Sequence, residues 1–358
     1  MRPLTVDATI TSSTSPRLRS LDAFLVTDIK NIRYLSGFTG STAYAIVTRD
    51  AAWLVTDSRY MTQARAEAKG FKVRLFRKAI DTLKELLVEL KVATLAFESN
   101  SVSYAFLLRL RKAFKGVKLK PEPAAIQKLR AVKDADEVAL IRASAALLDA
   151  GYKKAEAILR PGVVERDAAL EIEFAFRSMV AEGLAFDTII ASGERAALPH
   201  GKADFKKIKK GDLVVVDMGV LKDGYNSDET RTYCIGKATR EQRKVYEVVR
   251  GAQEKALDAL KPGVSASAVD FVARQYIEKA GYGRYFGHGT GHGVGLDIHE
   301  SPGIGPLSKD VLRDGMVVTV EPGIYIPGWG GVRIEDMALV VKGGYELITA
   351  TSKEFRCL

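Results

Sequence analysis

The sequence predicts an α+β protein with two domains: a small α/β domain, followed by a larger domain in which helices pack on an antiparallel sheet. The length supports two domains, because the chain has 358 residues and soluble domains commonly contain about 100–200. Short apolar runs alternate with helical patterns in the first part, whereas strand-rich hairpins dominate the second. The charge changes at the same point: residues 1–127 hold 21 basic and 11 acidic side chains, and residues 128–358 hold 33 of each.

Residues 1–127 show the pattern of the small α/β domain. The apolar runs FLV, AYAIV and AAWLV predict short strands, because turn-like clusters such as GFTGST and TRD separate them. Periodic apolar residues predict helices at about 58–69, 80–91 and 102–114. The segment PEPAAIQKLRAVKDADE carries two prolines and a burst of charge, which puts the expected domain boundary after Gln127.

Residues 128–358 begin with a long amphipathic helix, predicted at about 134–159 between acidic residues at its start and a Pro-Gly turn at its end. Further helices are expected at about 166–182 and 241–260. Hairpins are predicted in VVVDMGVLKDGYNSDETRTYCIG and MVVTVEPGIYIPGWGGVRIEDMALVV, with a Gly/His-rich stretch at 287–299 between them. The segments LRPGVVERDAALEIEF and KPGVSASAVDFVARQ each put a Pro-Gly turn before a helix, so two similar halves are expected.

The composition is that of an ordinary globular protein, with 47% hydrophobic and 27% charged residues, and it excludes a collagenous, mucin-like or wholly disordered chain. Cys234 and Cys357 are too few for a disulfide framework and form no CxxC pair, so a packed thiol is expected at Cys234. The N-terminal sequence lacks the apolar run of a secretory signal, and no apolar stretch of about 18 residues occurs. These features predict a cytoplasmic protein without a membrane span.

The first hairpin carries two acidic residues that are expected to face each other. Asp217 ends a run of three valines that is typical of a buried strand, where an unpaired charge would cost several kcal/mol. Reflecting the hairpin about Lys222 and Asp223, with Asp223 as a turn residue, brings Asp228 opposite Asp217 to within one residue. Two carboxylates in this arrangement repel each other unless a cation lies between them.

The second hairpin repeats the pattern. Glu321 and Glu335 reflect about Gly328 and therefore face each other, whereas Asp336, next in sequence, points to the opposite face and is expected to be structural. Two divalent ions would neutralise four inward carboxylates, and oxygen ligands shared between two metals are typical of dinuclear hydrolases.

All four histidines belong to the same part of the chain. His288, His292 and His299 lie in GHGTGHGVGLDIHESP, and His200 lies in ALPHGKADF before the first hairpin. The glycine run lacks the Lys-Ser/Thr of a phosphate-binding loop, so nucleotide binding is disfavoured. Its glycines are expected to let the backbone pass close to metals and substrate.

The motifs DMG…NSDETRT, GHGVGLDIHESP, TVEPGIY and GVRIED resemble those of the pita-bread metallopeptidases, the family of methionine aminopeptidase, aminopeptidase P and prolidase. The resemblance covers essentially residues 128–358, and residues 1–127, including NIRYLSGFTGS, resemble the creatinase-type N-terminal domain of the proline-specific branch. It implies a pita-bread catalytic domain that binds two divalent metal ions, with Mn²⁺ favoured over Co²⁺, Zn²⁺ or Fe²⁺. The implied ligands are Asp217, Asp228, His292, Glu321 and Glu335.

The resemblance also implies roles for individual residues. Asp228 and Glu335 would bridge the metals, and Glu321 would act as the general base. His200 and His299 would donate hydrogen bonds around the scissile bond, and His288 would contact the residue after it. For Arg333, an ion pair that orients a ligand carboxylate and a direct contact with substrate are equally supported.

The substrate class also follows from the resemblance, which implies cleavage of Xaa-Pro peptide bonds. We favour an aminopeptidase that releases the N-terminal residue; the alternative is a dipeptidase of the prolidase type. A pseudo-peptidase binding module and a metal-free, creatinase-like amidinohydrolase are disfavoured, because all five ligand positions are present. The basic residues of 1–127 are interpreted as a solvated face, so a nucleic-acid partner is not expected, and relatives suggest a homodimer.

Overall fold

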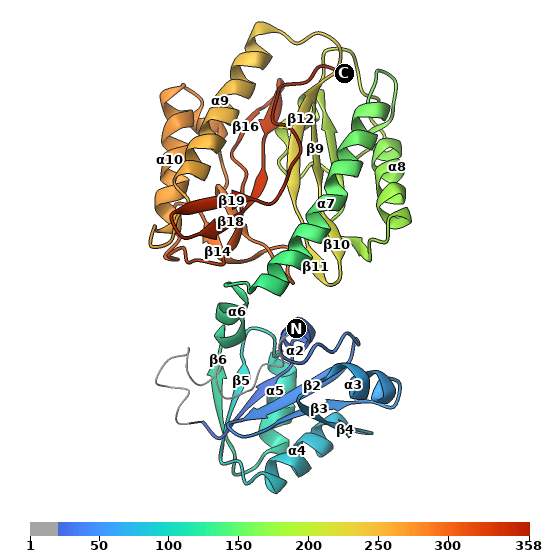
Figure 1. Cartoon of the computed structure of the whole chain (residues 1–358), viewed down its shortest axis with the longest axis vertical. Coiled ribbons are helices and arrows are strands. Elements are labelled where there is room, and N and C mark those ends of the chain that lie inside the picture. The colour runs from blue at the N-terminus through green and yellow to red at the C-terminus, as the bar shows by residue number, and fades with distance from the viewer. Residues whose placement is uncertain (1–20) are drawn as a thin grey trace. The chain divides into compact units, whose positions relative to one another are not determined.

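The computed structural model describes residues 21–358, and the chain divides into two units, Met1–Arg130 and Ala131–Leu358 (Figure 1). Each unit has its own apolar cores. Within the described residues, none of the helices combines the length and the apolar composition needed to cross a membrane.

The first unit is an α/β domain, as predicted. Its six-stranded sheet has the order β4-β3-β2-β1-β5-β6, with antiparallel pairing of β2 to β1 and β3 and parallel pairing elsewhere. The elements are β1 (Ala23–Val26), α2 (Ile29–Ser36), β2 (Ala43–Thr48), β3 (Ala52–Thr56), α3 (Met61–Glu67), β4 (Phe71–Leu75), α4 (Ala79–Glu89), β5 (Thr94–Glu98), α5 (Tyr104–Ala113), β6 (Lys118–Glu122) and α6 (Ala125–Arg130).

Helix α2 has no counterpart in the sequence analysis. It has only eight residues, and buried Ile32 and Leu35 contribute too short an apolar pattern to indicate a helix. Its end signals are nevertheless present. The side chain of Asp28 accepts hydrogen bonds from the first turn, and Gly37 ends the helix in the left-handed conformation, with φ of 77°.

The second unit is α+β, and the paired strands within its sheets are antiparallel. Its helices are α7 (Ala135–Ile158), α8 (Glu165–Ser178), α9 (Arg240–Asp258) and α10 (Ala266–Lys279), with short 3₁₀ turns η2 (Gly193–Ala197) and η3 (Gly283–Tyr285). Its strands are β7 (Gly183–Leu184), β8 (Ile189–Ser192), β9 (Leu213–Met218), β10 (Val220–Lys222), β11 (Tyr225–Asn226), β12 (Glu229–Cys234), β13 (Gly291–Gly293), β14 (Glu300–Ile304), β15 (Val317–Val320), β16 (Gly323–Ile326), β17 (Gly330–Arg333), β18 (Asp336–Val341) and β19 (Gly344–Leu347).

Two helix pairs flank these strands, one on each side (Figure 1). Helices α7 and α8 pack on β8 and β9 around one apolar cluster, and α9 and α10 pack on β15 to β18 around another. Helix α8 ends at Ser178, four residues earlier than predicted, because the chain turns away at Val180, whose φ is 65°. The strands therefore lie between two helical layers and carry the site residues between two apolar cores.

The two predicted halves begin with the same local structure. The NH of Gly162 donates to Ile208 O at 2.8 Å, and the NH of Gly263 donates to Leu312 O at 2.9 Å. Both glycines have φ near +90° (93° and 88°), a conformation that glycine adopts without strain. Each Pro-Gly turn thus fixes the start of its helix against the segment that leads into the following hairpin.

Candidate metal centre and active site

The first hairpin has a register that differs from the predicted one. Strand β12 pairs with β9 so that Thr230, not Asp228, lies opposite Asp217. The hairpin is centred between Asp223 and Gly224, one residue later than predicted. A shift of the centre by one residue moves each residue's partner by two positions. Asp223 and Gly224, with φ of 48° and 77°, are the two central residues of the turn, as in a type I′ hairpin where both need positive φ.

Both carboxylates nevertheless share one face. Side chains alternate along a strand, so Asp228 and Thr230 point the same way, and Asp217 points the same way as its partner Thr230. Asp217 and Asp228 are therefore diagonal neighbours, and both line one cavity of about 430 Å³.

The predicted register of the second hairpin is confirmed. Every residue pair in this hairpin reflects about Gly328. The pairing is interrupted at Glu321 and Glu335, but the register is the same on both sides of this break. Val320 lies opposite Asp336 on one side, and Gly323 lies opposite Arg333 on the other. The two glutamates therefore lie at equivalent positions where the chain passes from one sheet to the next. Both line the cavity.

The two hairpins are joined at Thr230 and Glu335. The NH of Glu335 donates to Thr230 O at 3.1 Å, and Thr230 Oγ1 donates to Glu335 Oε2 at 2.7 Å. This pair of hydrogen bonds holds Glu335 beside the carboxylates of the first hairpin.

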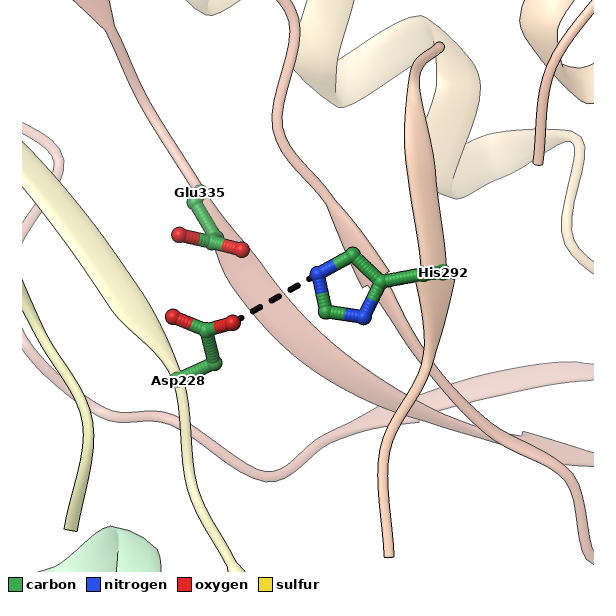
Figure 2. Close-up of side chains that lie close together, drawn as sticks. All are labelled: Asp228, His292 and Glu335. Atoms are coloured by element: carbon green, nitrogen blue, oxygen red, sulfur yellow. Dashed lines mark ion pairs between the residues drawn. The ribbon is translucent and has the colours of Figure 1, made fainter. Parts of the chain in front are cut away.

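His292 completes a compact donor group with Asp228 and Glu335 (Figure 2). One ligand atom from each of the three lies within 4.8 Å of the other two. His292 Nδ1 is 3.1 Å from Gly293 O, which favours the tautomer with the proton on Nδ1. His292 Nε2 then presents a lone pair, 3.5 Å from Asp228 Oδ2 and 3.4 Å from Glu321 Oε1.

The electrostatics of this group are unfavourable without a cation. Burial, followed by repulsion from neighbouring carboxylates, raises the pKa values of Asp228 and Glu335 well above their ordinary range, and burial also raises the pKa of Glu321. Burial lowers the pKa of His292, so its imidazole is neutral at pH 7 and available as a ligand.

Two buried carboxylate oxygens that line the cavity support the fit of a metal ion at this site. Asp217 Oδ1 and Glu335 Oε1 are buried and have no hydrogen-bond partner within residues 21–358. Buried acceptors are normally satisfied, and an unsatisfied one costs about 1–3 kcal/mol. Carboxylate oxygens with one imidazole are donors suited to a divalent metal ion such as Mn²⁺, Fe²⁺, Co²⁺ or Zn²⁺.

Every site residue predicted from the sequence lines the same cavity. These residues are Asp217, Asp228, His292, Glu321 and Glu335 among the predicted ligands, and His200, His288, His299 and Arg333 around them. The structure thus brings together four segments of the chain: the loop with His200, the first hairpin, the Gly/His-rich stretch and the second hairpin.

Arg333 forms the ion pair that was one of its two expected roles. Its Nη2 lies 2.6 Å from Asp217 Oδ2, and its Nε donates to Thr230 Oγ1 at 3.1 Å. Its Nη1 donates to Pro199 O at 3.0 Å and to Tyr325 Oη at 2.9 Å. Arg333 therefore orients a predicted ligand and spans both hairpins.

Tyr325 is a site residue that the sequence analysis missed. Its hydroxyl lies 2.9 Å from both Arg333 Nη1 and His288 Nε2, and burial raises its pKa to about 12, so it remains protonated. Its position in β16 gave no signal, because an aromatic residue in a buried strand is more often part of the core.

The glycines of the second motif have a packing role besides the expected one, for which Gly289 and Gly291 are suitably placed because they line the cavity. A Cβ on Gly291 would lie 2.0 Å from Thr319 O, and a Cβ on Gly293 would lie 2.4 Å from Ser301 O. These two glycines therefore also lie close to the backbones of the neighbouring strands β15 and β14. Small residues are needed there to seat β13, which carries His292, between them.

Two family models match the sequence. Residues 17–132 match the Creatinase/Prolidase N-terminal domain, and residues 139–342 match Metallopeptidase family M24. A Xaa-Pro dipeptidase of Pyrococcus horikoshii is 39% identical over 341 residues, covering 94% of each chain.

Solved structures agree with these matches. A Xaa-Pro dipeptidase from Bacillus anthracis superimposes with a TM-score of 0.93 at 39% identity, covering 94% of this chain and 95% of that one. An X-Pro aminopeptidase from Thermotoga maritima gives a TM-score of 0.90 at 38% identity, covering 96% and 99%. These likenesses extend over both units, so each of the two domains has a counterpart in these proteins.

Proposed function

This chain belongs to metallopeptidase family M24, and from that premise we propose that it is a dinuclear Xaa-Pro dipeptidase. The observation that carries the proposal is the set of five buried or half-buried donors around one cavity, in a chain 39% identical to a named Xaa-Pro dipeptidase along 94% of its length. The peptidase class rests on the family, and the dipeptide substrate on the relatives.

The dipeptidase alternative is now favoured over the aminopeptidase. Named curated relatives from two Pyrococcus species are Xaa-Pro dipeptidases. The aminopeptidase remains a second candidate for one reason: the X-Pro aminopeptidase structure from Thermotoga maritima is about equally similar.

Asp217, Asp228, His292, Glu321 and Glu335 are proposed to hold two divalent ions, with Mn²⁺ as the first choice. When bound, such ions polarise the peptide carbonyl and lower the pKa of water. Glu321 is proposed as the base that would accept a proton from the attacking water, because it lines the cavity beside the other proposed ligands.

The remaining cavity residues are proposed to orient the substrate. His200 and His299 would donate hydrogen bonds around the scissile bond. His288, fixed through its Nδ1 at 2.7 Å from Gly289 O and its Nε2 at the Tyr325 hydroxyl, would contact the proline that follows the bond. Arg333 would act through Asp217, because each of its three guanidinium nitrogens already contacts protein.

We also propose a homodimer located in the cytoplasm. The two cysteines are not joined in a disulfide: Cys234 is buried and Cys357 is exposed, which is compatible with a reducing compartment. The cluster of buried carboxylates argues against a pseudo-peptidase binding module, because a protein that only binds its partner would not need such a cluster.

A direct assay tests the proposed function. Protein reconstituted with Mn²⁺ or Co²⁺ is expected to hydrolyse Ala-Pro with a kcat/KM at least about tenfold higher than for Ala-Pro-Ala, and a chelator is expected to abolish both activities. Preference for the tripeptide would replace the dipeptidase with the aminopeptidase. Failure to cleave either peptide after reconstitution with each metal would overturn both.

His200 offers a second test, because it lines the cavity outside the compact donor group. The H200A variant is expected to keep its metal and to lose about 10²- to 10³-fold in kcat, the usual contribution of a positioned hydrogen-bond donor. Elemental analysis and steady-state kinetics on the same preparation separate the two effects. A loss of metal would make His200 a ligand and contradict the assigned role.

A further inference from the structure

The cavity is bordered by an exposed ion pair that the proposed chemistry does not use. Lys202 Nζ lies 2.6 Å from Asp187 Oδ2, and both residues line the cavity. The two side chains are 75% and 72% exposed. Asp187 precedes β8, and Lys202 follows His200 by two residues.

The backbone at Lys202 is held firmly although its side chain is exposed. The NH of Lys202 donates to His200 O at 2.9 Å, which forms a tight turn. The carbonyl of Lys202 accepts from Arg195, whose Nε lies 3.0 Å from the buried carboxylate of Glu165. Glu165 in turn accepts hydrogen bonds from the backbone and hydroxyl of Ser192. The loop that presents His200 and Lys202 is thus anchored to the core.

Among the described residues, one lysine and one arginine line this cavity, Lys202 and Arg333. Arg333 is 4% exposed and bound to Asp217, Tyr325, Thr230 and Pro199, so it is not available to a substrate anion. Lys202 can exchange its partner at low cost, because a solvent-exposed ion pair contributes little to stability.

We propose that Lys202 binds the C-terminal carboxylate of a dipeptide substrate and thereby selects dipeptides over longer peptides. This inference rests on the proposed function. In Xaa-Pro, the carboxylate is separated from the scissile nitrogen by the proline Cα alone. Because His200 is proposed to lie at the scissile bond, a group that binds this carboxylate must lie close to His200. Lys202 meets this condition, since Cα atoms two residues apart are at most about 7 Å from each other.

Binding exchanges one carboxylate for another: the substrate carboxylate replaces that of Asp187 on the ammonium group of Lys202. A third residue in the peptide replaces the proline carboxylate by a neutral peptide bond and moves the terminal charge about 3.5 Å further away.

The test compares free and amidated substrates. Lys202→Gln is expected to lower kcat/KM for Ala-Pro about tenfold, mainly through KM, and to change kcat/KM for Ala-Pro-NH₂ and Ala-Pro-Ala less than twofold. Lys202→Arg is expected to restore Ala-Pro hydrolysis to within about threefold of the wild type. The same comparison is made with L-proline and prolinamide as competitive inhibitors, where only the inhibition constant of proline is expected to rise in the glutamine variant.

Lys153→Gln is the matched control, because Lys153 is also 75% exposed and lies 2.6 Å from an aspartate, Asp149, but does not line the cavity. It is expected to leave all these values unchanged. Equal effects of Lys202→Gln on free and amidated ligands, or no effect on either, would overturn the assignment while leaving the dipeptidase intact. If the wild type cleaves no Xaa-Pro peptide, the proposed function fails and this inference fails with it.

Discussion

Asp228→Asn and Glu335→Gln are each expected to lower the bound metal below one ion per chain and to reduce kcat/KM for Ala-Pro by at least about 10³-fold. Both changes keep the size of the side chain and remove one negative charge. Each targeted carboxylate is buried, and one of its oxygens lies in the compact group with His292. Because both residues are proposed as ligands that would be shared by the two ions, losing either one should weaken the binding of both.

The first hairpin contains its own control. Asp223 is also an aspartate, but it lies in the turn with φ of 48°, which asparagine tolerates well. Asp223→Asn is expected to retain the metal and the activity of the wild type. Elemental analysis of dialysed protein together with the Ala-Pro assay checks all three variants. If the Asp228 or Glu335 variant still binds two ions, the bridging assignment is wrong.

The sequence was sufficient to predict features that depend on local chemistry and on strand periodicity. The reflection about Gly328 placed Glu321 and Glu335 at equivalent positions of the hairpin correctly, because alternation along two strands is enough to define a hairpin once its centre is known. The same method failed by two positions at Asp217, since the centre there depends on which residues take positive φ. Asp223-Gly224 is a typical type I′ pair and could have corrected the prediction.

Contacts between distant loops were not predictable from the sequence. Tyr325 contacts His288, and Lys202 contacts Asp187, yet neither pair follows from strand periodicity. They depend on how these segments converge after folding, which a single sequence does not specify. The predicted structural role of Asp336 is confirmed, but its partners were not foreseen.

Arg231→Met is expected to destabilise the protein by about 3–5 kcal/mol, the cost of breaking a buried ion pair from one side. The guanidinium of Arg231 is 2% exposed, and its Nη2 lies 2.8 Å from Glu229 Oε1 and 2.7 Å from Asp336 Oδ1. Its Nη1 donates to Glu335 O. Methionine fills similar space but leaves two buried carboxylates with less compensation. Urea unfolding in the presence of a chelator measures the loss without a contribution from metal binding.

A second substitution separates charge from packing. Burial already raises the pKa of Glu229 to about 7 even with Arg231 beside it, so Glu229 is the more costly of the two carboxylates to leave unpaired. Asp336 keeps Lys353 at 2.9 Å and a hydrogen bond from Gln253.

Adding Glu229→Gln to Arg231→Met is therefore expected to recover at least about 1 kcal/mol, because it removes the stranded charge. Arg142→Met, which breaks an exposed pair with Glu346, is the control and should change stability by less than about 0.5 kcal/mol. If the double variant is no more stable than Arg231→Met alone, the loss comes from the hydrogen bonds that Arg231 donates to backbone carbonyls. Arg231 would then stabilise the fold by joining β12 to the segment that carries Glu335 rather than by neutralising its acidic neighbours.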